Sequence, residues 1–272
     1  DSGSSRGLGD VYKRQTHTGA VTVTTDSVYT VDELKSINNK TTGAITLNDT
    51  TVALSGDATD LAAALAGTIT HTGAVTVTTD SNYTVDELKT IGAATSGAIT
   101  LNDTTVALSG SSSDLSTIFS ETITTHTGAV TVTTDSVYTV DELKSINNKT
   151  TGAITLNDTT VALSGDATDL AAALAGTITH TGAVTVTTDS NYTVDELKTI
   201  GAATSGAITL NDTTVALSGS SSDLSTIFSE TITTHTGAVT VTTDSVYTVD
   251  ELKSINNKTT GAITLNDTTV AL

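Results

Sequence analysis

Five histidines carry the most obvious potential for chemistry, because an imidazole can bind a metal or act as a general base near neutral pH. Each lies in the same string, THTGAVTVTTD, and they are His17, His71, His126, His180 and His235. Successive histidines are 54 or 55 residues apart, which places them about 10 Å apart along stacked strands. A zinc ligand lies about 2 Å from its metal, so these histidines cannot share one ion. We therefore predict imidazoles at corners or on the surface, with a carboxylate partner for each as the alternative.

Aspartates at the predicted turns are the next candidates. Stacked copies of a repeat would bring their carboxylates into rows, where like charges repel unless cations such as Ca²⁺ relieve them. The weak calcium candidates are Asp26, Asp49, Asp80 and Asp103. The sequence has neither the GGxGxDxUx nonapeptide nor a DxDxDG loop, and turn bonds and helix caps account for most of these acids. We therefore expect loose cation association, without a dedicated metal site and without a cofactor.

Catalytic signatures are missing from the chain. No GxSxG, HExxH, Walker or GxGxxG pattern occurs. An enzyme that cleaves a polysaccharide would need one asymmetric cluster of acidic or basic residues in a cleft, and identical repeat units offer none. We therefore predict that this protein is not an enzyme.

Threonine forms about a quarter of the repeated sequence. We expect a ladder surface on the outer side of the strands, made by Thr22, Thr24, Thr46, Asn48, Thr76, Thr78, Thr100 and Asn102. Such rows on parallel strands resemble those of ice-binding solenoids, and the resemblance implies a surface that orders water. Threonine is also simply a favourable residue on an exposed strand, and asparagine replaces it in alternate units, so ice binding is the weaker interpretation.

The composition excludes several classes of protein. The chain has 272 residues, 30 acidic and 11 basic side chains, a net charge of -19, and no Cys, Met, Trp or Pro. Without cysteine there is no disulfide, thiolate metal site or cysteine nucleophile. An acidic surface repels nucleic acid, and no run of about 18 apolar residues could span a membrane. We therefore expect no nucleic-acid partner and no membrane span in this chain.

Repeats dominate the sequence. Residues 16–124 recur unchanged at 125–233, and 234–272 begin a truncated third block. Within each block of 109 residues, GAVTV and GAITL alternate at spacings of 24 and then 30 or 31 residues. Short units that cannot bury an apolar face alone are typical of solenoids. We take 16–124, 125–233 and 234–272 as the domain blocks, and we expect both ends to be cuts in a longer reading frame.

Every unit predicts the same elements. GAVTVTT alternates between apolar and polar residues, which is the pattern of a half-buried strand. A second apolar run, VYTV or TVAL, predicts a partner strand. A short helix then begins at a capping box of Thr30 and Glu33 in one unit, and at Asp57 or Ser111 in the other.

These elements predict an α/β repeat solenoid, specifically a right-handed parallel β-solenoid with short helices on one side. Consecutive GA segments would stack on each other around one continuous apolar interior. The alternative is an array of small β-rich domains of 54 or 55 residues, which small apolar side chains would stabilise poorly without neighbours.

The first fifteen residues differ from everything that follows. The string SRGLGDVYKRQ at 5–15 resembles the translation of a transposase-type DNA sequencing adapter, which implies that residues 1–15 are non-native and disordered. They hold three of the 11 basic and two of the 30 acidic residues, so residues 16–272 carry 8 minus 28, or -20.

The string YTVDELKSINNKTTGAITLNDTTVALSG, and with it the whole of 16–272, resembles the tandem repeats of very large surface or secreted proteins of marine bacteria. The resemblance implies an extracellular or cell-surface location, and flanking domains that bind a surface or glycan. It favours a structural or adhesive spacer. A ladder surface that binds Ca²⁺, glycan or ice is the alternative.

Overall fold

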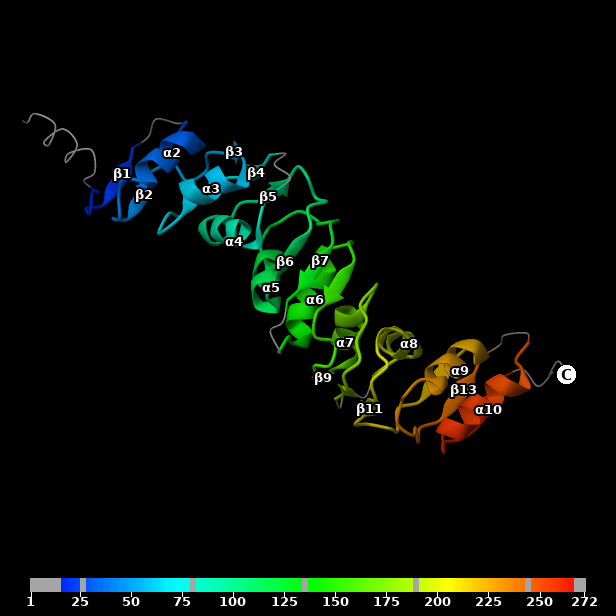
Figure 1. The fold of residues 1–272 in the computed structure, drawn as a ribbon. Coiled ribbons are helices and arrows are strands. Elements are labelled where there is room, and N and C mark those ends of the chain that lie inside the picture. The colour runs from blue at the N-terminus through cyan, green and yellow to red at the C-terminus, as the bar shows by residue number, and fades with distance from the viewer. Residues whose placement is uncertain are drawn as a thin grey trace, which may run out of the picture. The chain divides into compact units, whose positions relative to one another are not determined.

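The computed structural model describes residues 16–24, 28–78, 82–133, 137–187, 191–242 and 246–266. The chain divides into two compact units, 1–108 with 117–127, and 109–116 with 128–272. Residues 1–15, and with them the predicted adapter-derived segment, lie outside the described residues. The repeat blocks 16–124, 125–233 and 234–272 remain a sequence prediction. Strands and helices alternate along the chain in both units (Figure 1).

The first unit contains two parallel sheets. The strands are β1 (Val21–Val23) and β2 (Ile45–Leu47) in one sheet, and β3 (Leu54–Gly56), β4 (Val75–Val77) and β5 (Ile99–Leu101) in the other. Val21 lies opposite Ile45. In the second sheet, Val75 lies between Leu54 and Ile99.

The second unit repeats this arrangement with the same register. Its strands are β7 (Val130–Val132) with β8 (Ile154–Leu156), β9 (Leu163–Gly165) with β10 (Val184–Val186) and β11 (Ile208–Leu210), and β12 (Leu217–Gly219) with β13 (Val239–Val241) and β14 (Ile263–Leu265). All of these pairs are parallel. The boundary between the units falls within β6 (Leu108–Gly110).

Short helices connect the strands. They are α2 (Val31–Asn38), α3 (Ala58–Leu65) and α4 (Val85–Ala94) in the first unit, and α6 (Val140–Lys149), α7 (Ala167–Leu174), α8 (Val194–Ala203), α9 (Ser221–Ser229) and α10 (Val249–Lys258) in the second; α5 (Ser112–Ser120) contains the boundary. Consecutive helices pack against each other within each unit. The protein is therefore an α/β repeat solenoid, as the sequence predicts.

The alternative of small separate β-rich domains is wrong. Antiparallel pairing inside isolated globules would be expected of such domains, whereas the described strand pairs are parallel. The sheet β3-β4-β5 also joins a strand of one 54-residue unit to two strands of the next. Consecutive units therefore share their sheets.

Two details of the predicted strands are wrong. The run VYTV does not form a strand, because Tyr29 is buried and its hydroxyl donates to the Asp49 carbonyl at 2.8 Å, while Thr30 caps the helix. The run TVAL forms a strand only from Leu54 onward. That strand lies against the next GAVTV segment, so GA segments pair in twos and do not form one uninterrupted stack.

The helix starts follow the sequence closely. Thr30 and Glu33 form the predicted capping box, and the Asp57 side chain accepts the Asp60 N–H at 2.7 Å. Ser111 accepts the Asp114 N–H at 3.0 Å. These bonds satisfy amide groups that the first helical turn leaves free.

The core lies between the inner faces of the strands and the helices. Strand residues such as Val75 and Val77 are 0% exposed, as are Leu61 of α3 and Ile91 of α4. Small aliphatic side chains fill this interior, since the chain has two Phe and no Trp or Met. Each coil therefore depends on its neighbours for burial.

Candidate functional site

The predicted ladder surface lies on the outer side of the strands. Thr22 lies opposite Thr46 in β1-β2, and Thr76 lies opposite Thr100 in β4-β5, with Ser55 of β3 on its other side. Thr22, Thr24, Thr46, Asn48 and Asn102 are exposed, while Thr76, Thr78 and Thr100 are partly exposed. The structure brings these residues together within each sheet and does not join the two sheets into one row.

The two described calcium candidates are turn residues. One carboxylate oxygen of Asp49, Oδ1, accepts both the Thr51 N–H at 2.9 Å and the Thr51 hydroxyl at 2.7 Å. Asp103 makes the same two bonds with Thr105, at 2.9 and 2.6 Å. These hydrogen bonds hold the pKa of both carboxyl groups below its ordinary value.

A metal site needs several ligands at one point. The described part of the chain contains no group of three or more His, Cys, Asp or Glu side chains that could hold a metal. Asp26 and Asp80 lie outside the described residues. The calcium candidates therefore remain a prediction from sequence.

Four of the five histidines are buried, against the prediction of corner or surface imidazoles. His71, His126, His180 and His235 are each 0% exposed. Nε2 of His180 lies 2.7 Å from the Val161 carbonyl, and Nδ1 lies 3.1 Å from Oγ1 of Thr204. A neutral imidazole that carries its proton on Nε2 satisfies both contacts.

Burial lowers the pKa of all four histidines, and the bond to the backbone carbonyl only partly opposes this. No carboxylate is hydrogen-bonded to these rings in the contacts described. The alternative of a His–carboxylate pair on each coil is therefore wrong for His71, His180 and His235, whose ring nitrogens both have other partners.

Ion pairs join consecutive helices on the outer surface. Lys35 of α2 pairs with Asp60 of α3, and Lys144 pairs with Asp169 and Lys198 with Asp223 in the second unit. The side chains are about one third exposed. Such pairs contribute about 0–1 kcal/mol each, so they orient neighbouring helices more than they stabilise the fold.

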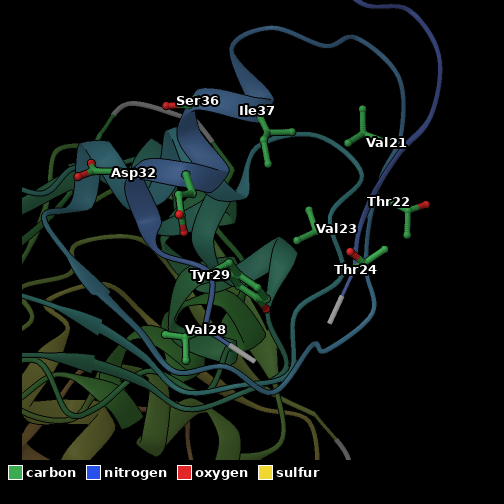
Figure 2. A pocket seen from close by; sticks show the side chains of 10 residues that line it. Val21, Thr22, Val23, Thr24, Val28, Tyr29, Asp32, Ser36 and Ile37 are labelled. Carbon is green, nitrogen blue, oxygen red and sulfur yellow. The ribbon is translucent and has the colours of Figure 1, made fainter. Parts of the chain in front are cut away.

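A hollow of about 630 Å³ opens at the first described coil, between β1 and α2. Its lining includes Val21, Val23, Tyr29, Glu33 and Ile37. Val23 and Ile37 face the space between the strand and the helix (Figure 2). Sequence reasoning did not find this surface, because the same residue types occur in later copies of the repeat, where they are covered.

Comparison with known proteins leaves the family open. No protein-family model and no curated protein matches the chain. A leucine-rich repeat-containing protein from Legionella pneumophila, LegL7, is similar in structure at 14% identity, with 94% of this chain and 87% of that chain covered and a TM-score of 0.23. The repeat solenoid is established by the strand registers and does not draw on this likeness. In the described residues, no helix is both long and apolar enough to cross a membrane.

Proposed function

We propose that this chain is a structural or adhesive spacer of a larger extracellular or cell-surface protein. The observation that carries the proposal is the reuse of one interface. Each GAVTV strand meets the following GAITL strand in the same register, as at Val21–Ile45, Val75–Ile99, Val130–Ile154, Val184–Ile208 and Val239–Ile263. A solenoid with a repeated interface lengthens by adding units without a new folding problem.

The surface chemistry supports the same role. A net charge of -19 opposes lateral association of copies. The outward side chains of the paired strands are threonines, which water solvates well. The buried imidazoles contact the interior of the fold and are closed to a ligand. A surface or glycan partner would then be bound by flanking domains.

Scattering in solution tests the spacer. Chains with one, two and three copies of residues 125–233 are compared by small-angle X-ray scattering. Each copy contains four GA strands, so the maximum dimension should rise by about 19 Å per copy at about 4.8 Å per strand. A dimension that grows with the cube root of mass, as for a compact particle, would sink the proposal.

A ligand-binding ladder is the second candidate, and it rests on the in-register Thr22–Thr46 and Thr76–Thr100 pairs. Calorimetry with Ca²⁺ and an ice-shaping assay on the full chain separate it from the spacer. Saturable heat at several sites per block would favour a calcium array, and faceted ice crystals would favour ice binding. A spacer should give neither signal. Glycan binding by this chain alone would also favour the ladder.

A further inference from the structure

The chain contains its own control for the hollow at the first coil. Residues 16–54 and 234–272 are identical in sequence, so any difference in burial between them arises from what packs against them. Val239, Val241 and Ile255 are 0%, 1% and 0% exposed, whereas their first-copy counterparts are all partly exposed. The hollow is therefore a face that is covered in the third copy and open in the first.

A strand and a helix cover the third copy. Leu217 of β12 lies opposite Val239, and Gly219 lies opposite Val241. Helix α9 packs on α10, and the Ser221 hydroxyl donates to Glu251 at 3.3 Å. The covering segment is thus the stretch of sequence that holds β12 and α9.

The backbone of the first copy presents the same hydrogen-bonding groups without partners. In the third copy the Leu217 N–H donates to the Ala238 carbonyl at 2.9 Å, and the Thr242 N–H donates to the Gly219 carbonyl at 2.9 Å. The equivalent groups are the Ala20 carbonyl and the Thr24 N–H, and within the described residues neither has a hydrogen-bond partner.

The turn before the strand shows the same contrast. The N–H groups of Thr236 and Gly237 both donate to the Thr213 carbonyl, at 2.8 and 2.9 Å. Their equivalents, the N–H groups of Thr18 and Gly19, have no acceptor among the described residues. The first copy therefore offers three free donors in the geometry that the third copy uses.

His17 completes the open face. Its counterpart His235 is fully buried, with Nε2 2.8 Å from the Val215 carbonyl and the ring 5.7 Å from that of Phe228. His17 is exposed. Val215 and Phe228 both belong to the segment that covers the third copy.

We propose that the open face of the first coil, formed by residues 17–24 and α2, is a docking site for a strand–helix segment with the sequence of residues 212–230, DTTVALSGSSSDLSTIFSE. The partner is a separate polypeptide that ends in this repeat segment and has no coil of its own to pack against. The segment adds a strand parallel to β1, as in β-strand addition, and its helix closes the hollow over Val23 and Ile37. The inference does not depend on the spacer function.

Charge makes the docking dependent on salt. The face carries Asp32 and Glu33 at the start of α2, and the segment carries Asp212, Asp223 and Glu230. These like charges repel, and salt screens the repulsion over about 8–10 Å near physiological ionic strength. The affinity is therefore expected to rise with salt, which is the reverse of a contact held by ion pairs.

Amide hydrogen exchange on the full chain tests the proposal, with a synthetic peptide of residues 212–230 as the probe. At saturating peptide, the amides of Thr18, Gly19 and Thr24 should exchange about tenfold more slowly, and the His17 ring signals should shift. The Leu217→Asp peptide should do neither, since it would bury a carboxylate. Unchanged exchange at millimolar peptide, or equal protection by the Leu217→Asp peptide, would overturn the proposal.

Variants of the chain give the matched control. Val23→Asp lies in the face and should weaken peptide binding about tenfold or more, whereas Thr46→Asp places the same charge on the outer side of the next strand and should leave binding unchanged. Exchange at β13 reports whether each variant remains folded. Protection of Thr18, Gly19 and Thr24 that rises with chain concentration alone would instead identify a second copy of this chain as the occupant.

Discussion

At the scale of single residues, the histidines show how a polar ring is used inside a solenoid of small side chains. The Thr95 hydroxyl lies 3.1 Å from Nδ1 of His71 and also accepts the Gly97 N–H at 3.0 Å. The imidazole therefore connects the backbones of neighbouring coils. The sequence could not show this, because THTG is a polar string that matches an exposed turn equally well, and only the stacked Val52 carbonyl gives the ring a buried partner.

Replacement of a buried histidine should weaken the fold, while the same change at the exposed copy should not. His180→Ala removes the partner of the Val161 carbonyl and of Thr204 and leaves them buried, which costs about 1–3 kcal/mol. His17→Ala should change stability by less than about 0.5 kcal/mol. Urea unfolding followed by circular dichroism measures both. Equal effects of the two variants would contradict a bonding role for the buried ring.

The buried histidines also predict a loss of stability in mild acid. Their pKa values in the fold lie below the ordinary value because burial disfavours the charged ring, so the unfolded chain binds protons first as the pH falls. Their contribution is complete above about pH 6.5 and decreases below it. The urea midpoint should therefore fall between about pH 8 and pH 5.5.

Carboxylates give a second step at lower pH, which separates the two effects. The pKa values of Asp49, Asp103, Asp158 and Asp212 are lowered by hydrogen bonds from the threonine two residues later. Their contribution is present above about pH 4 and is lost as the pH falls below that. A midpoint that stays flat down to about pH 5 would show that histidine protonation is not destabilising.

At the scale of elements, two kinds of helix pair solve the same packing problem. In the pair α2–α3, Asn38 Nδ2 donates to the carbonyls of Ala63 and Ala66 at 3.0 and 2.8 Å, which caps the end of the next helix. In α4 the equivalent residue is Gly92, where a Cβ would come within 2.8 Å of Glu121 Cγ. The alternate sequence therefore exchanges a capping amide for space under a glutamate.

Loss of the capping amide should destabilise the following helix. Asn147 in the second unit makes the same bonds, to the carbonyls of Ala172 and Ala175 at 2.9 Å each. Asn147→Ala should cost about 1 kcal/mol and should speed amide exchange in α7. Asn148→Ala is the matched control, because that side chain is exposed, and it should have little effect. Unchanged exchange in α7 after Asn147→Ala would contradict the cap.

The glycine of each GA pair is required by the close approach of neighbouring coils. A Cβ at Gly97 would overlap the Gly73 carbonyl, which belongs to the adjacent coil and cannot rotate away. Gly97→Ala should therefore cost about 3 kcal/mol or more, as expected of overpacking against backbone. At Gly67, with φ of 86° and open space around it, alanine should cost only about 1 kcal/mol. Thermal unfolding of both variants checks the difference, and equal losses would contradict a steric role at Gly97.

Local signals predicted the elements better than the connections between them. Capping at Thr30, Asp57 and Ser111 was predictable because the cap and its amide lie within four residues of each other. The strand at Leu54–Gly56 was not, because Ser55 and Gly56 favour a turn in isolation and become a strand only beside β4. Predictions failed where the partner lies about 20 residues away.

At the scale of the whole chain, identical sequences occupy different positions in the array. The string HTGAVTVTTDS occurs five times, so its amides have nearly the same intrinsic exchange rates. The N–H groups of Val21, Val184 and Val239 also make the same bond, at 2.9 Å, to the alanine carbonyl of the next coil. Any difference in their exchange therefore reports the protection that neighbouring coils provide.

The exchange rates of these three amides should follow their neighbours. In a solenoid, opening starts at the ends, since stability is a sum of unit and nearest-neighbour terms. Val184 lies between two strands and should exchange slowest. Val239 should be intermediate, because β12 covers one side while α10 beyond it leaves Val249 48% exposed. Val21, with β2 alone beside it in the described residues, should exchange about tenfold or more faster than Val184. Equal rates at all three would mean that the chain opens as one cooperative body, which would contradict a stability built from separate neighbour contacts.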